Sequence, residues 1–311
     1  MDIRLKQISY SSRASLQSCP RKYQLSKYGV ASNEEQDLNS QITFSFGSVV
    51  GLGVQLAWQD KSIEEITWEM FLAWEVLPTD ESTKHSKSLW LAVSAIRNLI
   101  SLRESGFLSE WRLLYWQGKP AVELSYIVDL GDGFNDRGFV DLVLENIRTG
   151  EVMVVECKTD STKTISQAKY GNSTQALGYS VVLDCIKPGL NSFTVLYLIY
   201  RTELMEWLPL PIVKNSLTKA EWLNTVLLTK LTLELYEKFK FYPREGSKCN
   251  TMFGDCKYYG ICNLSDTLLL KPITEVEKSR LLKDNEEKYQ LKLNFTDLVN
   301  QQAELLEENL N

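Results

Sequence analysis

Two apolar, largely β-branched runs near the middle of the chain predict neighbouring strands. They span residues 138–144 and 152–159, and the short stretch 146–150 between them predicts the turn of an antiparallel hairpin. Further strands are expected, in chain order, at residues 111–116, 121–128, 192–200 and 202–210.

Amphipathic segments on both sides of these strands predict helices, because their apolar residues recur every three or four positions. Near the N-terminus, serine caps and Pro20 predict two short helices that meet at Cys19. Longer helices are expected at residues 46–58, 63–77, 89–105, 175–185 and 217–241. This order of elements predicts a mixed α/β fold.

Composition places the chain among globular proteins rather than disordered ones, since 44% of its 311 residues are hydrophobic. No apolar stretch is long enough to span a bilayer and no signal core follows the N-terminus, so we expect a cytoplasmic protein without membrane association. The net charge of −6 argues against a uniformly basic surface for nucleic acid, although it leaves room for a local basic groove. The single histidine, His85, argues against histidine-based catalysis and against a histidine-rich zinc site.

The predicted hairpin carries three charged residues where its strands begin and end. Because side chains alternate along a strand, Glu156 and Lys158 are expected on one face and Cys157 on the other. If Asp141 turns toward that first face, two carboxylates and one ammonium share a site. Carboxylate oxygens suit a hard divalent cation, and the lysine could orient or deprotonate a water beside it. The simpler alternative is a set of solvated charges at strand ends.

Six cysteines are too few for a secreted disulfide scaffold in a chain of this length, so thiols or metal ligands are expected. Cys249, Cys256 and Cys262 fall within one short irregular segment, and Cys19 could supply a fourth ligand. Four thiolates fit either a zinc ion or a cubane iron–sulfur cluster. The alternative is a group of unrelated thiols, which is how we interpret the remaining cysteines, Cys157 and Cys185.

Several of these residues together resemble motifs of one enzyme family. Asp141 followed by Glu156-Cys157-Lys158 resembles the D…(D/E)xK core of the PD-(D/E)xK nuclease superfamily. The sequence from Gln175 to Tyr179 resembles the QxxxY motif of its RecB-like branch. The segment 11–23 resembles the N-terminal segment of that branch, and Cys249, Cys256 and Cys262 resemble the C-terminal cysteines of its iron–sulfur members. The resemblance covers roughly residues 8 to 265.

The resemblance implies a restriction-endonuclease-like core sheet flanked by helices. It implies one RecB-like nuclease domain over residues 1–270, followed by an acidic helical tail at 271–311. Within that domain we expect a helical insertion at about 47–105, the core at about 106–242 and the cysteine segment at 243–265.

The resemblance also implies metal-dependent hydrolysis of phosphodiester bonds. Asp141, Glu156 and the main-chain carbonyl of Cys157 would bind Mg²⁺ or Mn²⁺, and Glu123 matches an acidic position upstream. Lys158 would position the attacking water and stabilise the developing charge. Gln175 and Tyr179 would organise the site and contact DNA. The four cysteines Cys19, Cys249, Cys256 and Cys262 would hold a [4Fe-4S] cluster, with Zn²⁺ as the alternative.

The chain departs from the branch at two places. A histidine usually stands four residues after a glycine in the first long helix, but here Gly47 is followed at that distance by Gly51. Six residues separate Cys249 from Cys256, where several relatives have a tighter pair. A phosphate-binding loop of the Gly-Lys-Ser/Thr type is absent from the sequence, so any unwinding requires a helicase or another recombination or repair protein as a partner.

The sequence therefore predicts a DNA exonuclease or end-processing enzyme that acts on single strands or duplex ends. Two alternatives stay open. The missing histidine favours a catalytically inactive, nuclease-fold subunit that binds DNA or assembles with partners. Nothing in the sequence separates DNA from RNA as the substrate.

Overall fold

The structure, a computed structural model, describes residues 1–31, 38–76, 85–162, 164–188, 192–251 and 254–308. Residue contacts divide the chain into two compact units. The first unit consists of Met1–Glu35, Ser125–Phe139 and Ser216–Asn311, and the second of Gln36–Leu124 and Val140–Asn215. Strands β5 (Val122–Asp129) and β6 (Asn135–Asn146) contribute residues to both units.

The second unit is built on a mixed sheet. The end of β6 pairs antiparallel with β7 and with β2, β7 pairs parallel with β8, and β8 pairs antiparallel with β9. The parallel pair requires a crossover connection, which helices α7 and α8 supply. The bounds of these elements are β2 Trp111–Leu113, β7 Val152–Asp160, α7 Gln167–Gly171, α8 Thr174–Ile186, β8 Ser192–Arg201 and β9 Glu206–Asn215.

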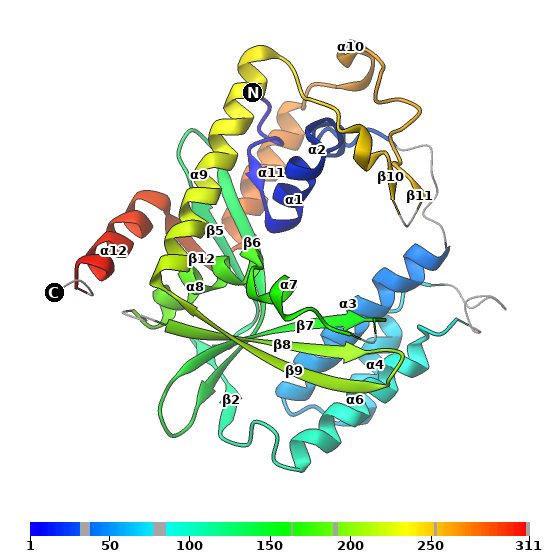
Figure 1. The fold of residues 1–311 in the computed structure, drawn as a ribbon, viewed down its shortest axis with the longest axis vertical. Coiled ribbons are helices and arrows are strands. Elements are labelled where there is room, and N and C mark those ends of the chain that lie inside the picture. The colour runs from blue at the N-terminus through cyan, green and yellow to red at the C-terminus, as the bar shows by residue number, and fades with distance from the viewer. Residues whose placement is uncertain (32–37, 77–84, 163, 189–191, 252–253, 309–311) are drawn as a thin grey trace. The chain divides into compact units, whose positions relative to one another are not determined.

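Helices α3 (Leu38–Trp58), α4 (Ile63–Leu72) and α6 (Leu89–Glu104) pack against one face of this sheet. Figure 1 shows these helices together beside strands β7, β8 and β9. The shared core contains alternate residues of the strands, among them Leu142, Val155 and Leu198. Alternation therefore places Asp141, Glu156 and Lys158 on the opposite face. A short hairpin of β3 (Tyr115–Trp116) and β4 (Lys119–Pro120) completes the unit.

Helix α7 lies over that opposite face. Tyr170 of α7 packs on Tyr197 of β8, with ring centroids 4.7 Å apart. Tyr197 is the register partner of Glu156, so α7 and the start of α8 belong to the side of the sheet on which the charged residues lie.

The first unit gathers helices from both ends of the chain. Helix α1 (Tyr10–Ser18) begins at a capping box formed by Ser9 and Ser12, and α2 (Pro20–Lys27) begins with a proline in its first turn. Cys19, between them, is extended, as the predicted helix junction requires. The remaining elements of the unit are β1 Gln7–Ile8, α9 Ser216–Phe239, the 3₁₀ helix η1 Gly246–Lys248, β10 Asn250–Thr251, β11 Gly254–Asp255, α10 Asp266–Leu269, α11 Glu275–Lys288, β12 Leu291–Asn294 and α12 Phe295–Glu308.

The residues after Lys271, expected to be a helical tail, include a strand. Strand β12 pairs parallel with β5, from Leu291 opposite Tyr126 to Asn294 opposite Asp129. Asn285 of α11 is buried and donates to the side chain of Gln7 at 3.0 Å. The described part of this segment is therefore packed into the first unit; residues 309–311 lie outside the described residues.

The predicted mixed α/β fold, with a sheet flanked by helices, is confirmed. The predicted range 1–270 for a single nuclease domain stays a prediction, since the contacts group the chain differently. Helix α3 begins at Leu38, earlier than expected, and α7 forms between the predicted strand 152–159 and the predicted helix 175–185, where the sequence analysis places no helix. Among the described residues, every helix is too short or too polar to cross a membrane.

Two glycines of helix α3 give a matched test of this packing. A Cβ at Gly53 would lie 2.5 Å from Cγ1 of Ile96 and 3.0 Å from Sδ of Met70, whereas a Cβ at Gly51 meets nothing within 4 Å. We expect Gly53→Ala to lower the free energy of unfolding by about 1–3 kcal/mol through overpacking. Gly51→Ala should raise it by up to about 1 kcal/mol through helix propensity. Urea denaturation of both variants checks this, and equal effects would contradict the packing of α3 on α4 and α6.

Candidate active site

The hairpin of β6 and β7 brings the three predicted charged residues together in the second unit. Their strands pair from Glu145 opposite Val152 to Leu142 opposite Val155, and the next residues along the strands are Asp141 and Glu156. Oδ2 of Asp141 accepts a hydrogen bond from the backbone N–H of Cys157 at 3.1 Å. The two carboxylates therefore lie on the same face, as the sequence analysis required for a shared site.

Lys158 links these carboxylates to helix α8. Its ammonium forms a hydrogen-bonded ion pair with Oε1 of Glu156 and donates to Oε1 of Gln175 at 3.3 Å. Gln175 in turn donates from Nε2 to the hydroxyl of Tyr179 at 2.7 Å. A continuous chain of polar contacts thus runs from the buried Glu156 to the buried Tyr179.

Burial and like charge dominate the electrostatics of the site. Burial first, and then the neighbouring Glu156, raise the pKa of Asp141 to about 8 despite the nearby Lys158. Glu123 adds a further, smaller repulsion that also raises the pKa of Asp141. With Asp141 and Glu156 both ionised, the site would hold more negative charge than Lys158 balances, so Asp141 keeps its proton to a higher pH than an ordinary carboxyl.

The opposite effect acts on the lysine. Burial favours the neutral amine, but the charge and hydrogen bond of Glu156, with Asp141 behind them, raise the pKa of Lys158 above its ordinary value. Burial and the same carboxylates raise the pKa of the Cys157 thiol, so this side chain stays protonated. Cys157 packs against the helix-covered face, as alternation predicts.

One atom of the site lacks a polar neighbour among the residues described. Glu156 is only 1% exposed, and its Oε2 has no hydrogen-bond partner among the described residues. An orphaned carboxylate oxygen beside a second carboxylate of raised pKa suits a hard divalent cation. The residues present therefore fit the metal site that the sequence predicts.

Sequence reasoning missed Gln55 of helix α3. Its Nε2 donates to Oε1 of Glu123 at 2.6 Å, and Glu123 has a left-handed backbone with φ of 47°. Such a conformation is uncommon for a side-chain-bearing residue and is often found at functional sites. The one sequence feature that pointed to Gln55 was its position four residues after Gly51, on the same helix face. Gly47 lies at the other end of this face. A Cβ added at Gly47 would lie 3.7 Å from Oγ1 of Thr159, which is ordinary van der Waals contact.

The four predicted cluster cysteines all belong to the first unit. Cys19, Cys249, Cys256 and Cys262 line one cavity of about 130 Å³. Slight burial, and then the negative charge that each of the other three would carry as a thiolate, raise the pKa of Cys249. The structure therefore brings together thiols from both ends of the chain.

The sulfurs do not crowd around a single point. In the part of the chain that the structure describes, no three cysteine, histidine or acidic side chains converge at the spacing of ligands around one metal ion. Cys157 and Cys185 are separate from the cavity, and Cys185 donates to the carbonyl of Val181 within α8.

Comparison with known proteins identifies one family. The sequence profile of the PD-(D/E)XK nuclease superfamily matches residues 7–263, which include all of the residues discussed above. Among curated proteins, none matches the sequence of this chain.

One solved structure shows a similar fold. One is the crystal structure of a candidate exonuclease from Eubacterium rectale, at 14% sequence identity and a TM-score of 0.50. The alignment covers 88% of this chain and 93% of that one. The protein SSO0001 aligns with 14% identity over 71% of this chain and 86% of its own, with a TM-score of only 0.31.

The raised pKa of Asp141 predicts a pH dependence of the metal-free protein. The Asp141 carboxyl binds its proton more tightly in the folded protein, with a pKa of about 8, than in the unfolded chain, with a pKa of 3.8. Its contribution to stability is therefore fully present below pH 3.8 and is lost as the pH rises from 3.8 to about 8. In Asp141→Asn, which stays neutral, this loss should disappear. The variant should therefore gain stability relative to the wild type by up to about 1.4 kcal/mol per pH unit.

Urea denaturation at several pH values between about 5 and 8, in the presence of a chelator, measures this difference. Other groups titrate in both proteins, so the informative quantity is the gap between the two curves. Parallel curves would contradict the burial and repulsion assigned to Asp141.

Proposed function

Because the chain belongs to the PD-(D/E)XK nuclease superfamily, we propose that it is a divalent-metal-dependent DNA nuclease, an exonuclease or end-processing enzyme, with its active site at Asp141, Glu156 and Lys158. The observation that carries the proposal is a pair of carboxylates on one sheet face: the buried Glu156, with an orphaned oxygen, and the half-buried Asp141, with a raised pKa. Two carboxylates held together in this way need a cation.

Asp141, Glu156 and the main-chain carbonyl of Cys157 would hold Mg²⁺ or Mn²⁺, with Glu123 as a further acidic group nearby. When bound, the cation neutralises charge on the phosphate and makes a bound water more acidic. Proton loss from Asp141 accompanies binding, because its pKa of about 8 leaves much of it protonated near neutral pH. Gln55 keeps Glu123 oriented through its hydrogen bond.

Lys158 would orient the attacking water and stabilise the charge that develops on the phosphate. Its raised pKa favours this role over deprotonation of the water, because the ammonium has no lone pair to accept a proton. Gln175 keeps Lys158 directed at Glu156, and Tyr179 fixes Gln175 in turn. Both residues would organise the site beside the DNA backbone.

We further propose that Cys19, Cys249, Cys256 and Cys262 hold a [4Fe-4S] cluster that ties the two ends of the chain together. A zinc ion would draw four sulfurs to about 2.3 Å from one point. In a cubane cluster each cysteine binds a different iron, so the sulfurs stand further apart. Four thiols lining one cavity support a shared metal centre, with Zn²⁺ as the alternative to the cluster.

One observation favours a second candidate function, that of an inactive subunit which binds DNA or assembles with a helicase or repair partner. Gly51 stands where related nucleases carry a metal-binding histidine, and its side of α3 is open. The intact Lys158–Glu156 pair favours the active enzyme, since binding alone does not require it.

The catalytic proposal predicts a large loss of activity on removal of a site residue. Asp141→Ala should abolish hydrolysis of DNA in Mg²⁺ or Mn²⁺, and Lys158→Ala should slow it by about 10²–10³-fold, because charge stabilisation at the phosphate is lost. Glu145→Ala, on the same strand but paired with Arg112 at the surface, serves as a control and should retain activity. A wild type as inactive as Asp141→Ala would favour the DNA-binding subunit.

The same assay with DNA substrates of different topology distinguishes the possible modes of cleavage. Linear DNA labelled at either end, closed circular DNA and single strands separate an exonuclease from an endonuclease and report its polarity. Degradation of linear but not circular DNA is the expected result. Gel-shift measurements in the presence of a chelator record binding independently of cleavage, and matched RNA substrates test the choice of nucleic acid.

The cluster proposal predicts a colour and an iron content for protein purified without oxygen. The wild type should be brown, with close to four iron atoms per chain, whereas Cys256→Ser should lose most of the iron. Cys185→Ser, outside the cavity, should keep it. A colourless protein with one zinc ion per chain would replace the cluster with a structural zinc site.

A further inference from the structure

We infer that Arg21 is a positioning residue for the cysteine site: its side chain fastens the segment after Cys262 to the helix that begins directly after Cys19. The inference rests on the proposed metal-binding role of the four cysteines. It goes beyond that role by assigning the assembly of the thiols to the protein itself rather than to the metal alone.

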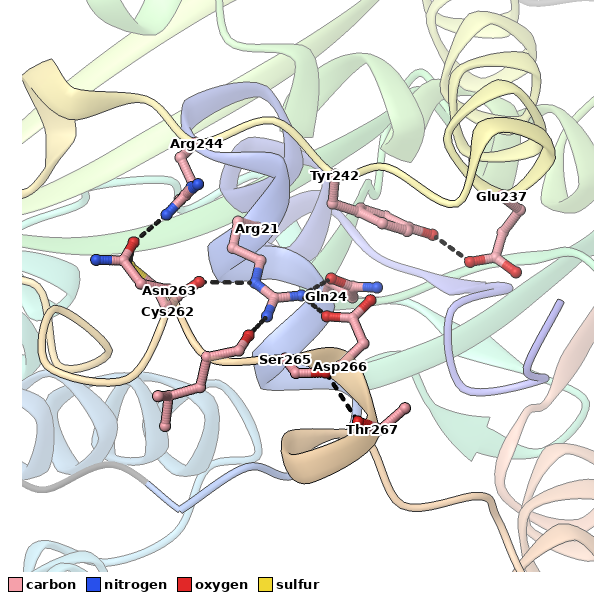
Figure 2. Close-up of polar contacts among 11 residues, drawn as sticks. Arg21, Gln24, Glu237, Tyr242, Arg244, Cys262, Asn263, Ser265, Asp266 and Thr267 are labelled. Carbon is pink, nitrogen blue, oxygen red and sulfur yellow. Dashed lines mark hydrogen bonds and ion pairs between the residues drawn. The ribbon is translucent and has the colours of Figure 1, made fainter.

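The Arg21 guanidinium binds three acceptors on the segment 262–266. Nε donates to the carbonyl of Cys262 at 3.3 Å, Nη2 donates to the carbonyl of Leu264 at 3.2 Å, and Nη1 forms an ion pair with Asp266. Figure 2 shows the guanidinium of Arg21 with the carbonyl of Cys262 on one side and the side chains of Gln24 and Asp266 together on the other. All three nitrogens of the planar guanidinium thus donate, which the single ammonium of a lysine cannot reproduce.

The backbone of the same residue contacts the other stretch that leads to the cysteines. The N–H of Arg21 donates to the carbonyl of Pro243 at 3.0 Å, and Pro243 precedes Cys249 along the chain. Arg21 therefore touches the chain both before the first and after the last cysteine of the C-terminal segment. Since Arg21 follows Cys19 by two residues, one side chain aligns both ends of the chain at the cavity.

The position of Arg21 makes these bonds strong. Arg21 is only 7% exposed, so water competes little for its donors, and removal of its side chain takes these donors away from the carbonyls of Cys262 and Leu264. Apart from the buried Tyr258, the C-terminal segment buries little of its own: Cys249, Cys256 and Cys262 are only partly buried, and all three residues from Asn263 to Ser265 are exposed. Such a segment needs an external anchor to hold its ligands ready for a metal.

A second explanation for any effect of Arg21 is its charge, since a nearby cation stabilises thiolates. The chain offers a matched pair of variants that separates the two. Lys22 lines the same cavity and carries the same charge, but its side chain is not part of the clamp. Lys22→Ala therefore removes a charge and keeps the clamp, whereas Arg21→Lys keeps the charge and breaks the clamp.

The first measurement uses the full chain without metal. Amide hydrogen exchange of peptides covering residues 259–270 reports the turns of this segment, such as the bond from the N–H of Cys262 to the carbonyl of Tyr258. We expect exchange at least about tenfold faster in Arg21→Ala and Arg21→Lys than in the wild type, and unchanged exchange in Lys22→Ala. Asp266→Asn, which leaves both carbonyl bonds in place, should be intermediate.

The second measurement titrates Co²⁺ into the same metal-free proteins and follows the thiolate-to-metal absorption. Affinity should fall about 10–100-fold in Arg21→Ala and Arg21→Lys, as for the loss of an outer-shell partner, and should change little in Lys22→Ala. Far-UV circular dichroism checks that each variant is folded. If Arg21→Ala is not, the more conservative Arg21→Lys and Asp266→Asn carry the test.

Two results would overturn the inference: unchanged exchange in both Arg21 variants, or equal losses of affinity in Arg21→Ala and Lys22→Ala with normal affinity in Arg21→Lys. A wild type that binds no metal at its cysteines is a different outcome, because it removes the proposed cluster. The exchange experiment then still decides whether Arg21 holds the thiol-bearing segment in place.

Discussion

The candidate active site depends on the repulsion between Asp141 and Glu156. Two carboxylates on one face of a mostly buried hairpin are unfavourable, and a single ammonium, that of Lys158, does not balance both. The raised pKa of Asp141 and the orphaned oxygen of Glu156 are two expressions of this imbalance. A hard cation would remove both, so the free energy lost in holding the site together without metal becomes affinity for the metal.

The surrounding residues fix this arrangement without neutralising it. Gln175 and Tyr179 hold Lys158 from helix α8, while Gln55 of α3 holds Glu123 in a left-handed backbone conformation. None of these contacts adds positive charge. They restrict the geometry of the charged groups, which is the condition under which a metal site binds tightly and places a water accurately.

The cysteine cavity of the first unit follows the same logic with different chemistry. Thiols from both chain ends line it, and the contacts that align them are hydrogen bonds of Arg21 rather than bonds between the thiols. Protein contacts that hold ligands near their bound positions reduce the entropy lost on metal binding. In both units, then, hydrogen bonds from residues that are not ligands help to hold the proposed ligands in position.

The sequence by itself determined which side chains could share a face. Alternation along a strand placed Glu156 with Lys158 and separated Cys157 from them, and the helical spacing of Gln175 and Tyr179 put them on one side of α8, because both periods are properties of the local backbone. The mixed α/β fold followed from the same patterns. Strand β12 and the early start of α3 did not follow from these patterns, since the pairing of β12 with β5 and the burial of Ile42 in α3 depend on distant residues.

Only the tertiary structure decided the rest. The pairing of Leu142 with Val155 turned Asp141 toward Glu156, and the packing of α3 beside β5 brought Gln55 to Glu123. The meeting of Cys19 with the C-terminal cysteines, and the clamp of Arg21, join residues more than 200 positions apart. Such contacts are set by strand register and by the packing of elements, and no local period of the sequence encodes either of them.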